Sequence, residues 1–294
     1  MKISVITPFY EGAEYMKKYI ECMDANKSTL EAQGHQLEVI LVNDSPWKKL
    51  EVASGANQYI KVITNEKNSG IHYSRVAGLK EATGDYIMFL DQDDLLEQAG
   101  LLKLGEALEA ADLDIVIANA KLEQADGTYL KWYRTKAHQQ LAWDLSTYLK
   151  VGTQIISPGQ CLIKKKAVPE FWKTNLVRVN GADDYYLWLL MMAAKAQACV
   201  LGEAEYIHRF TGNNISADTS ATDASVYDFI DLLYDCDYFD KQDIITLHEM
   251  ITYKAQFRKS GLIGKIGCSL ANLNIFLTNI KFKKVTKTGY GFNR

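Results

Sequence analysis

The chain has 294 residues, of which 48% are hydrophobic and 23% are charged. This composition excludes a disordered chain, and the length suits one large domain or one domain with an appendage. The five cysteines are scattered without a CxxC pair, and the opening Met1-Lys2-Ile3 lacks signal-peptide organisation. We therefore expect a cytoplasmic protein with reduced, mostly buried thiols, and neither a disulfide framework nor a zinc site.

The first part of the chain alternates strand and helix patterns. Apolar and β-branched runs predict strands at residues 3–7, 37–42, 60–64, 86–90 and 115–118, with helices over 14–33, 70–82 and 96–111. The runs at 37–42 and 86–90 are continuous, which is typical of strands buried on both faces. This βαβ rhythm predicts a mostly parallel sheet with helices on both faces.

The pattern changes in the second part of the chain. Residues 121–133 hold Ala-Asp-Gly between two strand-like pieces, which is a hairpin signal. Further strands are expected at 160–163 and 204–210, with a helix over 183–195. These elements predict antiparallel strands that extend the sheet, and after about residue 216 the patterns are almost all helical.

Asp91-Gln92-Asp93-Asp94 directly follows the apolar run 86–90. Ligands of open α/β sheets bind beyond the carboxyl ends of the strands, and carboxylates there suit a hard divalent cation. Such a cation would bridge phosphate oxygens and neutralise a diphosphate leaving group. The alternative is an Asp-rich turn in which Asp94 caps a helix at Leu95.

Two other acidic motifs have both a functional and a structural interpretation. In Asn43-Asp44-Ser45-Pro46, the acid could accept hydrogen bonds from a ribose or base, or form a plain Asx turn. Asp183-Asp184 precedes an apolar helix. These acids could supply a general base for an acceptor hydroxyl, or only complement the helix dipole.

Several larger side chains are further candidates for ligand contacts. Trp188, with Tyr185 and Tyr186, could stack on a sugar, although packing in the core is the commoner role. Arg209 and Arg75 could bind a diphosphate; the alternative for Arg75 is a solvated helix face. His208, which precedes Arg209, is interpreted as packed.

The order and spacing of these motifs resemble family 2 glycosyltransferases, inverting enzymes of the GT-A fold, over about residues 1–216. The resemblance rests on Thr7-Pro8-Phe9-Tyr10-Glu11, Val42-Asn43-Asp44-Ser45, Asn68-Ser69-Gly70 with Arg75, Phe89-Leu90-Asp91-Gln92-Asp93-Asp94 and Asp183-Asp184-Tyr185. It implies a GT-A catalytic domain at 1–216, divided into a nucleotide-binding half (1–118) and an acceptor half (119–216), followed by a helical region at 217–294.

The resemblance also implies roles for individual residues. A nucleotide-sugar donor, expected to be a UDP-sugar, would contact Pro8, Phe9, Tyr10, Glu11, Asp44, Arg75 and Asp91. Asp93 would bind Mn²⁺ or Mg²⁺, Asp184 would be the base, and Asp183, Trp188 and Arg209 would contact acceptor or diphosphate. These roles require Asp93 and Asp184 to converge on one cleft. The sequence departs from the family where a histidine is usual, since Thr211 stands there.

This interpretation predicts transfer of a sugar to a saccharide or lipid-linked acceptor during synthesis of cell-surface polysaccharide or glycolipid, without a nucleic-acid partner. One alternative is a sugar-phosphate nucleotidyltransferase, which would need a glycine-rich, arginine-containing loop after the first strand. The other is a non-catalytic nucleotide-binding or scaffolding protein, which would not need to keep Asp44, Asp91, Asp93 and Asp184.

The tail at residues 254–294 holds nine Lys and Arg residues and no acid, whereas the rest carries 24 basic and 36 acidic residues. Residues 262–280 place Leu and Ile at helical spacing between lysines, too short a run to span a bilayer. We expect peripheral contact with the inner face of the plasma membrane, with packing on the catalytic domain or in a homo-oligomer as the alternatives.

Overall fold

The computed structural model describes residues 1–52, 58–124, 126–209 and 218–288. The chain forms two compact units, and each is described by itself. Unit 1 contains residues 1–132, 156–176 and 196–214, and unit 2 contains residues 133–155, 177–195 and 215–294. The units combine separate stretches of chain, and the linear domain boundaries predicted from the sequence stay a prediction.

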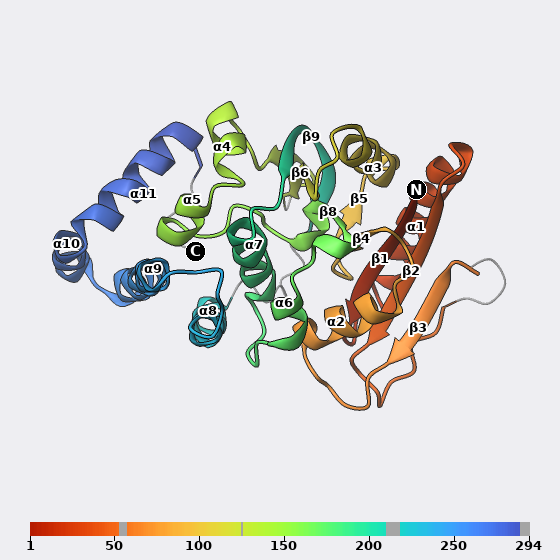
Figure 1. Ribbon diagram of the computed structural model, residues 1–294, viewed down its shortest axis with the longest axis horizontal. Helices are drawn as coiled ribbons and strands as arrows, with labels where there is room; N and C mark the ends of the chain where they lie inside the picture. The colour runs from red at the N-terminus through yellow and green to blue at the C-terminus, as the bar shows by residue number, and fades with distance from the viewer. Residues whose placement is uncertain (53–57, 125, 210–217, 289–294) are drawn as a thin grey trace. The chain divides into compact units, whose positions relative to one another are not determined.

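Unit 1 is built on one nine-stranded sheet (Figure 1). Its strands are β1 (Lys2–Phe9), β2 (Gln36–Asn43), β3 (Ile60–Thr64), β4 (Tyr86–Phe89), β5 (Leu95–Leu96), β6 (Ile115–Glu123), β7 (Tyr129–Lys131), β8 (Cys161–Lys164) and β9 (Ala198–His208). Its helices are α1 (Met16–Ala32), α2 (Ile71–Glu81), α3 (Gly100–Ala110) and α6 (Glu170–Thr174), with 3₁₀ turns η1 (Pro158–Gln160) and η2 (Lys165–Ala167).

The strand order is β3-β2-β1-β4-β8-β6-β9-β5, with β7 paired to β6. Strands β3, β2, β1 and β4 are parallel, while β8 lies antiparallel between β4 and β6. The structure therefore confirms a mostly parallel sheet extended by antiparallel strands. The sequence did not predict that β8 would separate β4 from β6, because strand order depends on long-range pairing.

Helices cover both faces of the parallel part of the sheet. The Tyr19 hydroxyl of α1 lies 2.6 Å from Thr7 Oγ1 on one face of β1. On the other face, Gly78 of α2 lies so close to Ile6 that a Cβ there would overlap the isoleucine. Successive side chains of a strand point to opposite faces, so α1 and α2 flank β1 from its two sides.

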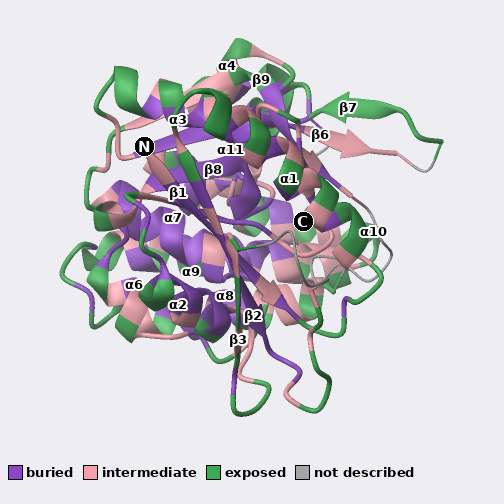
Figure 2. Ribbon diagram, turned by 90° about the vertical axis from the view of Figure 1, so that its right-hand side faces the viewer, coloured by how far each residue is buried: buried purple, intermediate pink, exposed green. Residues whose placement is uncertain are grey.

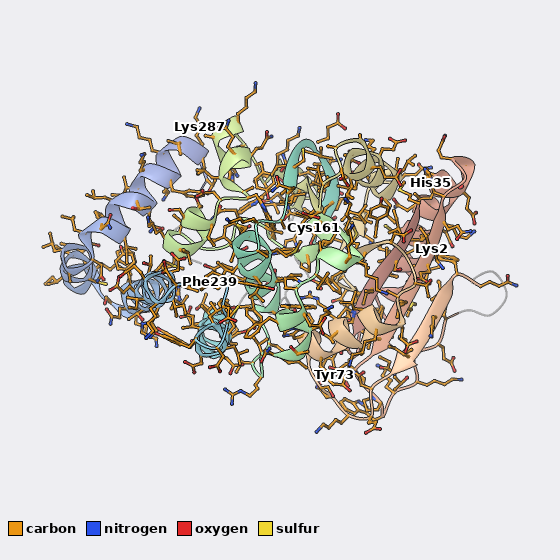
Figure 3. All side chains as sticks on the ribbon, viewed as in Figure 1. Lys2, His35, Tyr73, Cys161, Phe239 and Lys287 are labelled. Carbon is orange, nitrogen blue, oxygen red and sulfur yellow. The ribbon has the colours of Figure 1, made fainter. Side chains whose placement is uncertain are left out.

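The core of unit 1 follows from the continuous apolar runs. Val39, Leu41 and Val42 of β2 are wholly buried, as Ile87 and Met88 of β4 are. All five cysteines are free; Cys161 on β8 (Figure 3) and Cys236 are buried, and the other three are half-buried.

Unit 2 consists of helices: α4 (Lys136–Leu141), α5 (Leu145–Lys150), α7 (Asp183–Ala193), α8 (Thr219–Leu233), α9 (Lys241–Lys259), α10 (Leu262–Ala271) and α11 (Leu273–Thr286). The helical pattern expected after residue 216 is confirmed for the described residues. The continuous helix expected over residues 262–280 is interrupted, because Asn272 (φ −123°, ψ 45°) separates α10 from α11. Within the described ranges, no helix has the length and hydrophobicity needed to cross a bilayer.

Lys254 of α9 is a buried cation in unit 2. Its Nζ donates to the Val151 carbonyl oxygen at 2.5 Å, and its side chain is screened from water. Burial, with a smaller contribution from the charge of Arg258, lowers the pKa of Lys254 to about 7, and Asp223 partly opposes this change. The folded unit therefore favours the neutral amine above about pH 7.

We expect a pH-dependent stability from Lys254. The unfolded chain keeps this proton up to about pH 10.4, so between about pH 7 and 10 the unfolded state binds more protons and stability rises with pH. Below pH 7 both states are protonated and the full cost of burying the charge is present. Lys254→Met should have a higher free energy of unfolding than the wild type at pH 7. This difference should shrink by up to ~1.4 kcal/mol for each unit by which the pH rises.

Urea denaturation at several pH values measures this difference. Lys241→Met is the control, because Lys241 is an exposed lysine of the same helix. A constant gap between Lys254→Met and the wild type across this pH range would contradict the assignment.

Candidate active site

Three loops that follow parallel strands meet at one edge of the unit 1 sheet. The register pairs Phe9 with Asn43, so β1 and β2 end at the same level, and it pairs Ile6 with Phe89, so the residues after β4 run alongside the last residues of β1. The loops at 10–12, 44–48 and 91–94 therefore lie side by side beyond the carboxyl ends of these strands. This is the edge at which ligands bind in open α/β sheets.

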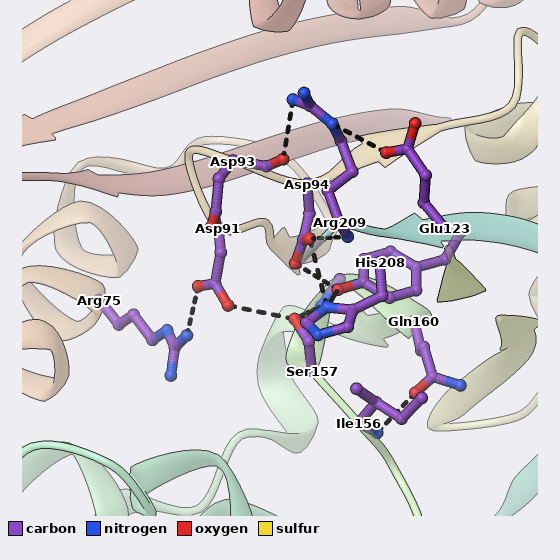
Figure 4. Close-up of polar contacts among 12 residues, drawn as sticks. Arg75, Asp91, Asp93, Asp94, Glu123, Ile156, Ser157, Gln160, His208 and Arg209 are labelled. Carbon is purple, nitrogen blue, oxygen red and sulfur yellow. Dashed lines mark hydrogen bonds and ion pairs between the residues drawn. The ribbon is translucent and has the colours of Figure 1, made fainter. Parts of the chain in front are cut away.

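Asp91 is held by two side chains from distant parts of the sequence (Figure 4). Arg75 of α2 donates to its Oδ1 at 2.6 Å, and Ser157 donates to its Oδ2 at 3.1 Å. The Arg75 side chain is 3% exposed, so the solvated helix face considered for it is wrong. Arg75 instead neutralises Asp91, in an ion pair between a buried guanidinium and a half-buried carboxylate.

Asp94 does not cap a helix. It precedes β5, which pairs with β9, and α3 begins only at Gly100. The Asp94 carboxylate accepts hydrogen bonds from the Tyr206 hydroxyl and from the Arg209 backbone N–H (3.0 Å). Asp94 thus fastens the loop after β4 to the end of β9, and the helix capping considered as an alternative does not occur.

His208 completes the contacts around Asp94. Its Nδ1 lies 3.3 Å from Asp94 Oδ1. Burial by itself would lower the pKa of His208, but the hydrogen bond and the negative charge of Asp94 outweigh burial and raise it. The packed position expected for His208 is confirmed, since its side chain is 7% exposed.

Asp93 lies between these two acids in sequence and has a different environment. Burial, together with the negative charges of Asp94 and Asp91, raises the pKa of Asp93 to about 6. Arg209 reaches over the loop, donating to the Asp93 carbonyl oxygen at 3.2 Å and to Glu123 at 3.2 Å. Arg209 therefore lies beside the carboxylate cluster. The sequence interpretation expected Arg209 to contact the acceptor or the diphosphate.

The carboxylate oxygens of this cluster are ligands that Mn²⁺ or Mg²⁺ prefers. A bound cation would also relieve the repulsion that raises the pKa of Asp93. Among the described residues, no three His, Cys, Asp or Glu side chains form a group that could hold a metal ion. A cation bound by Asp93 would therefore need its remaining ligands from substrate phosphate oxygens and water, which is a common arrangement for Mg²⁺.

Gln92, the middle residue of the acidic motif, connects the loop after β4 to the loop after β1. Its Oε1 accepts from the Tyr10 backbone N–H at 3.0 Å, and its Nε2 donates to the Tyr10 carbonyl at 3.1 Å. Gly12 lies beside this contact, and a Cβ there would overlap the Gln92 amide and displace it. This clamp aligns two loops that the sequence predicted separately.

The loop after β1 also contacts the loop after β2. The Glu11 backbone N–H donates to Ser45 Oγ at 3.1 Å, and Trp47 Nε1 donates to Glu11 Oε1 at 3.2 Å. Glu11 has φ +49°, an uncommon conformation for a residue other than glycine. Tyr10 and Trp47 lie edge to face, 6.2 Å between ring centroids, and are 46% and 61% exposed. They form an exposed aromatic surface beside the acidic loop.

Asp44 organises the turn that begins α2. Its Oδ1 accepts from Asn65 Nδ2 and the Ser69 backbone N–H, both at 2.8 Å, and its Oδ2 accepts from the Gly70 N–H at 2.9 Å. Asp44 is 4% exposed, so its carboxylate shapes the loop. Phe9 is likewise buried, and Pro8 lies within β1, so Tyr10 and Glu11 are the exposed members of the predicted nucleoside contacts.

Asp183 and Asp184 begin helix α7 in unit 2. Asp183 is buried, and Asp184 is half-buried with its Oδ1 accepting from the Tyr185 N–H at 2.7 Å. The preceding loop is anchored to α8, because the Ala182 N–H donates to Ser225 Oγ at 3.0 Å and that hydroxyl donates to Val179. The convergence of Asp184 with Asp93 stays a prediction.

The aromatic residues of α7 belong to the core of unit 2. Trp188 and Tyr186 are 0% exposed and Tyr185 is 5% exposed. Trp143 packs edge to face on Trp188 at 6.3 Å between centroids. Trp188 therefore has no face open to a sugar, and it packs in the core as the alternative interpretation of the sequence expected. Thr211, at the expected histidine position, lies outside the described residues.

The sequence interpretation missed Gln92, Ser157 and Tyr206, which hold the acidic loop in place. Gln92 stood inside a motif already singled out, but only the two acids flanking it suggested chemistry. Ser157 and Tyr206 carry no local signal, since their roles arise from long-range packing.

Comparison with known proteins establishes the family. Residues 4–172 match the family described as glycosyl transferase family 2, which is more than half of the chain. The chain belongs to glycosyl transferase family 2, as the motifs predicted.

Individual relatives are bacterial glycosyltransferases. The chain is 37% identical over 118 residues to the cholesterol galactosyltransferase of Borreliella burgdorferi, covering 39% of this chain and 31% of that protein. It is 25% identical over 220 residues to the putative teichuronic acid biosynthesis glycosyltransferase TuaG of Bacillus subtilis, covering 74% and 82%. The chain spans about a third of the length of curated relatives such as the cholesterol galactosyltransferase and EpsJ of Bacillus subtilis.

Solved structures confirm the predicted fold class. The crystal structure of S. aureus TarS residues 1–349 has a TM-score of 0.58 at 18% identity, covering 88% of this chain and 73% of that chain. The same TarS fragment in complex with UDP-GlcNAc has a TM-score of 0.58 at 16% identity, covering 97% and 82%. At these identities the likeness concerns the fold alone.

The Gln92 clamp predicts non-additive losses of stability. Gln92→Ala removes both hydrogen bonds to Tyr10 and should lower the free energy of unfolding by about 1–2 kcal/mol. Gly12→Ala should cost a similar amount, because the new methyl group displaces the Gln92 amide. Adding Gly12→Ala to Gln92→Ala should cost little more, since the overlapping group is gone.

Urea denaturation of the two single variants and the double variant completes this cycle. Losses that simply add in the double variant would show that Gly12 and Gln92 act independently.

Proposed function

We propose that this chain transfers a sugar from a nucleotide-diphosphate sugar, with UDP as the nucleotide, to an acceptor hydroxyl with inversion at the anomeric carbon. The observation that carries the proposal is the acidic cluster after β4, formed by Asp91, Asp93 and Asp94. In this cluster Arg75 neutralises Asp91, whereas the pKa of Asp93 is raised to about 6. Membership of glycosyl transferase family 2 supports it.

The donor would bind over the edge where the loops after β1, β2 and β4 meet. Tyr10 and Trp47 offer an exposed aromatic surface for a base, and Glu11 lies beside them. Arg209 offers a guanidinium for the diphosphate beside Asp93. The TarS structures in complex with UDP and UDP-GlcNAc are compatible with this donor class.

Asp93 would hold Mn²⁺ or Mg²⁺ together with the donor phosphates. When bound, the cation would neutralise charge on the diphosphate leaving group. Asp93 is suited to this role, because an acid whose ionisation is opposed by neighbouring carboxylates gains most from a cation. Metal and nucleotide should therefore bind cooperatively.

Asp184 would act as the general base. It takes the proton from the acceptor hydroxyl as that oxygen attacks the anomeric carbon, and the bond from this carbon to the diphosphate oxygen breaks. The product has the inverted configuration, and the nucleoside diphosphate leaves. A saccharide or lipid-linked acceptor of surface polysaccharide or glycolipid synthesis fits the bacterial relatives, one of which is assigned to teichuronic acid biosynthesis.

Metal-dependent nucleotide binding tests the role of Asp93. UDP with Mn²⁺ should raise the melting temperature of the wild type, corresponding to about 2.7 kcal/mol at a hundred times Kd. EDTA should abolish most of this shift, and Asp93→Asn should lose it even with Mn²⁺ present, because one metal ligand is gone.

Asp85→Asn is the matched control. Asp85 is an exposed acid at the opposite end of β4 and should leave the shift unchanged. If Asp93→Asn kept the full Mn²⁺-dependent shift, or if the wild type responded to no nucleotide, the proposed donor site would be wrong.

The role of Asp184 has a separate test. Asp184→Asn should lower transfer from UDP-sugars to saccharide acceptors by ~10²–10⁴-fold, because the hydroxyl then keeps its proton. Its melting shift with UDP and Mn²⁺ should match the wild type. Release of UDP across a panel of UDP-sugars and acceptors measures the transfer; undiminished transfer by Asp184→Asn would refute this assignment.

A further inference from the structure

Helices α10 and α11 expose a series of large aliphatic side chains. We define the apolar face as Leu262, Ile263, Ile266, Leu270, Leu273, Leu277 and Ile280, which are 42–86% exposed. Figure 2 shows α10 coloured largely as exposed. On α10 these positions fall within one side of the helix, because they are spaced by three and four residues.

The packing of α10 is inverted relative to an ordinary helix of a globular protein. Its only buried residue is Ser269, whose hydroxyl donates to the Lys265 carbonyl. Cys268 donates to the Tyr253 carbonyl of α9 at 3.8 Å, and the Lys265 ammonium lies 5.3 Å from the ring centroid of Phe257. The polar side of α10 therefore faces α9, and its Leu and Ile side chains point outward.

Helix α11 shows the same inversion in part. Its buried residues are Asn279, Phe282 and Thr286, of which Asn279 donates to the Lys150 carbonyl of α5 at 3.3 Å. Leu277 and Ile280 flank Asn279 in sequence and are 53% and 42% exposed. Amphipathic helices normally bury the apolar stripe, so this exposed stripe is a surface suited to an apolar environment.

The charge of the segment that carries the apolar face is wholly positive. No acid occurs from residue 254 to residue 294. Lys259, Lys281, Lys283, Lys284 and Lys287 are all exposed, at the end of α9 and along the last turns of α11. An apolar face bordered by cations matches the interface of a bilayer that carries anionic headgroups.

A second copy of this chain is a poorer match for the same surface. A symmetric contact through the apolar face would bring the lysines of two copies into one interface, with no acid in the segment to offset them. The anionic bilayer supplies both the apolar environment and the opposite charge.

We propose that α10 and α11 dock this protein on an anionic membrane, with the apolar face in the interface and the lysines on the headgroups. This docking is independent of the sugar-transfer proposal, because none of its residues belongs to the candidate donor site. A membrane-docked transferase would have direct access to acceptors attached to lipid.

Flotation of the full chain with lipid vesicles tests the proposal. The chain should float with vesicles of equal parts phosphatidylcholine and phosphatidylglycerol, much less with phosphatidylcholine alone, and less again at high salt. Leu262→Gln, Ile263→Gln and Leu270→Gln combined should lower the apparent vesicle affinity at least about tenfold. Lys281→Gln, Lys283→Gln and Lys284→Gln combined should do the same.

Each combination has a matched control elsewhere on the chain. Val62→Gln, Leu130→Gln and Ile245→Gln replace exposed aliphatic residues outside α10 and α11. Lys17→Gln, Lys18→Gln and Lys80→Gln replace three exposed lysines of α1 and α2. Both controls should float like the wild type. Melting temperatures, and the shift with UDP and Mn²⁺, verify that each variant is folded.

Three results would overturn the proposal. The first is a wild type that fails to float with anionic vesicles, and the second is equal flotation with neutral and anionic vesicles. The third is that the apolar-face variant floats as well as the wild type, while light scattering shows that the wild type is a dimer and that this variant is not. None of these results bears on the donor site, whose failure would appear as a missing response to UDP and Mn²⁺.

Discussion

Three carboxylates within four consecutive residues follow β4, and the repulsion among them is the constraint around which the site is built. The fold gives each one a different environment. Arg75 and Ser157 hold Asp91, while Tyr206, His208 and the Arg209 backbone surround Asp94. Asp93 keeps a pKa of about 6 because burial and both neighbours oppose its charge. A site that gathers negative charge in this way is suited to a divalent cation and a diphosphate.

The same loop is tied to the rest of the candidate site through uncharged contacts. Gln92 clamps the loop after β1, Ser45 binds the Glu11 backbone, and Asp44 fixes the turn that begins α2. Residues that the sequence assigned to nucleotide binding thus divide into two groups. Tyr10 and Glu11 are exposed, whereas Asp44 and Phe9 are buried and position the loops. Rigid support of this kind favours binding, because the loops lose little freedom when a ligand arrives.

The two ends of the chain show opposite uses of hydrophobic residues. In unit 1, the apolar runs of β2 and β4 are buried in the sheet, as their continuity predicted. In α10, the Leu and Ile side chains are exposed while Ser269 is buried. A periodic pattern identifies which residues share a helix face, but it does not say whether that face meets protein, lipid or water. The contacts of α10 with α9 decide that point within unit 2.

The sequence by itself determined the elements that rest on local patterns: the parallel strands, the hairpin of β6 and β7, the acidic loop after β4 and the family. It could not determine that β8 separates β4 from β6, that Asp94 joins β9, or that Arg75 neutralises Asp91, because each depends on residues far apart in the chain. The break at Asn272 and the burial of Trp188 were likewise decided by packing. Periodicity and motifs are local properties, whereas strand order, ion pairing and burial follow from the free energy of the whole fold.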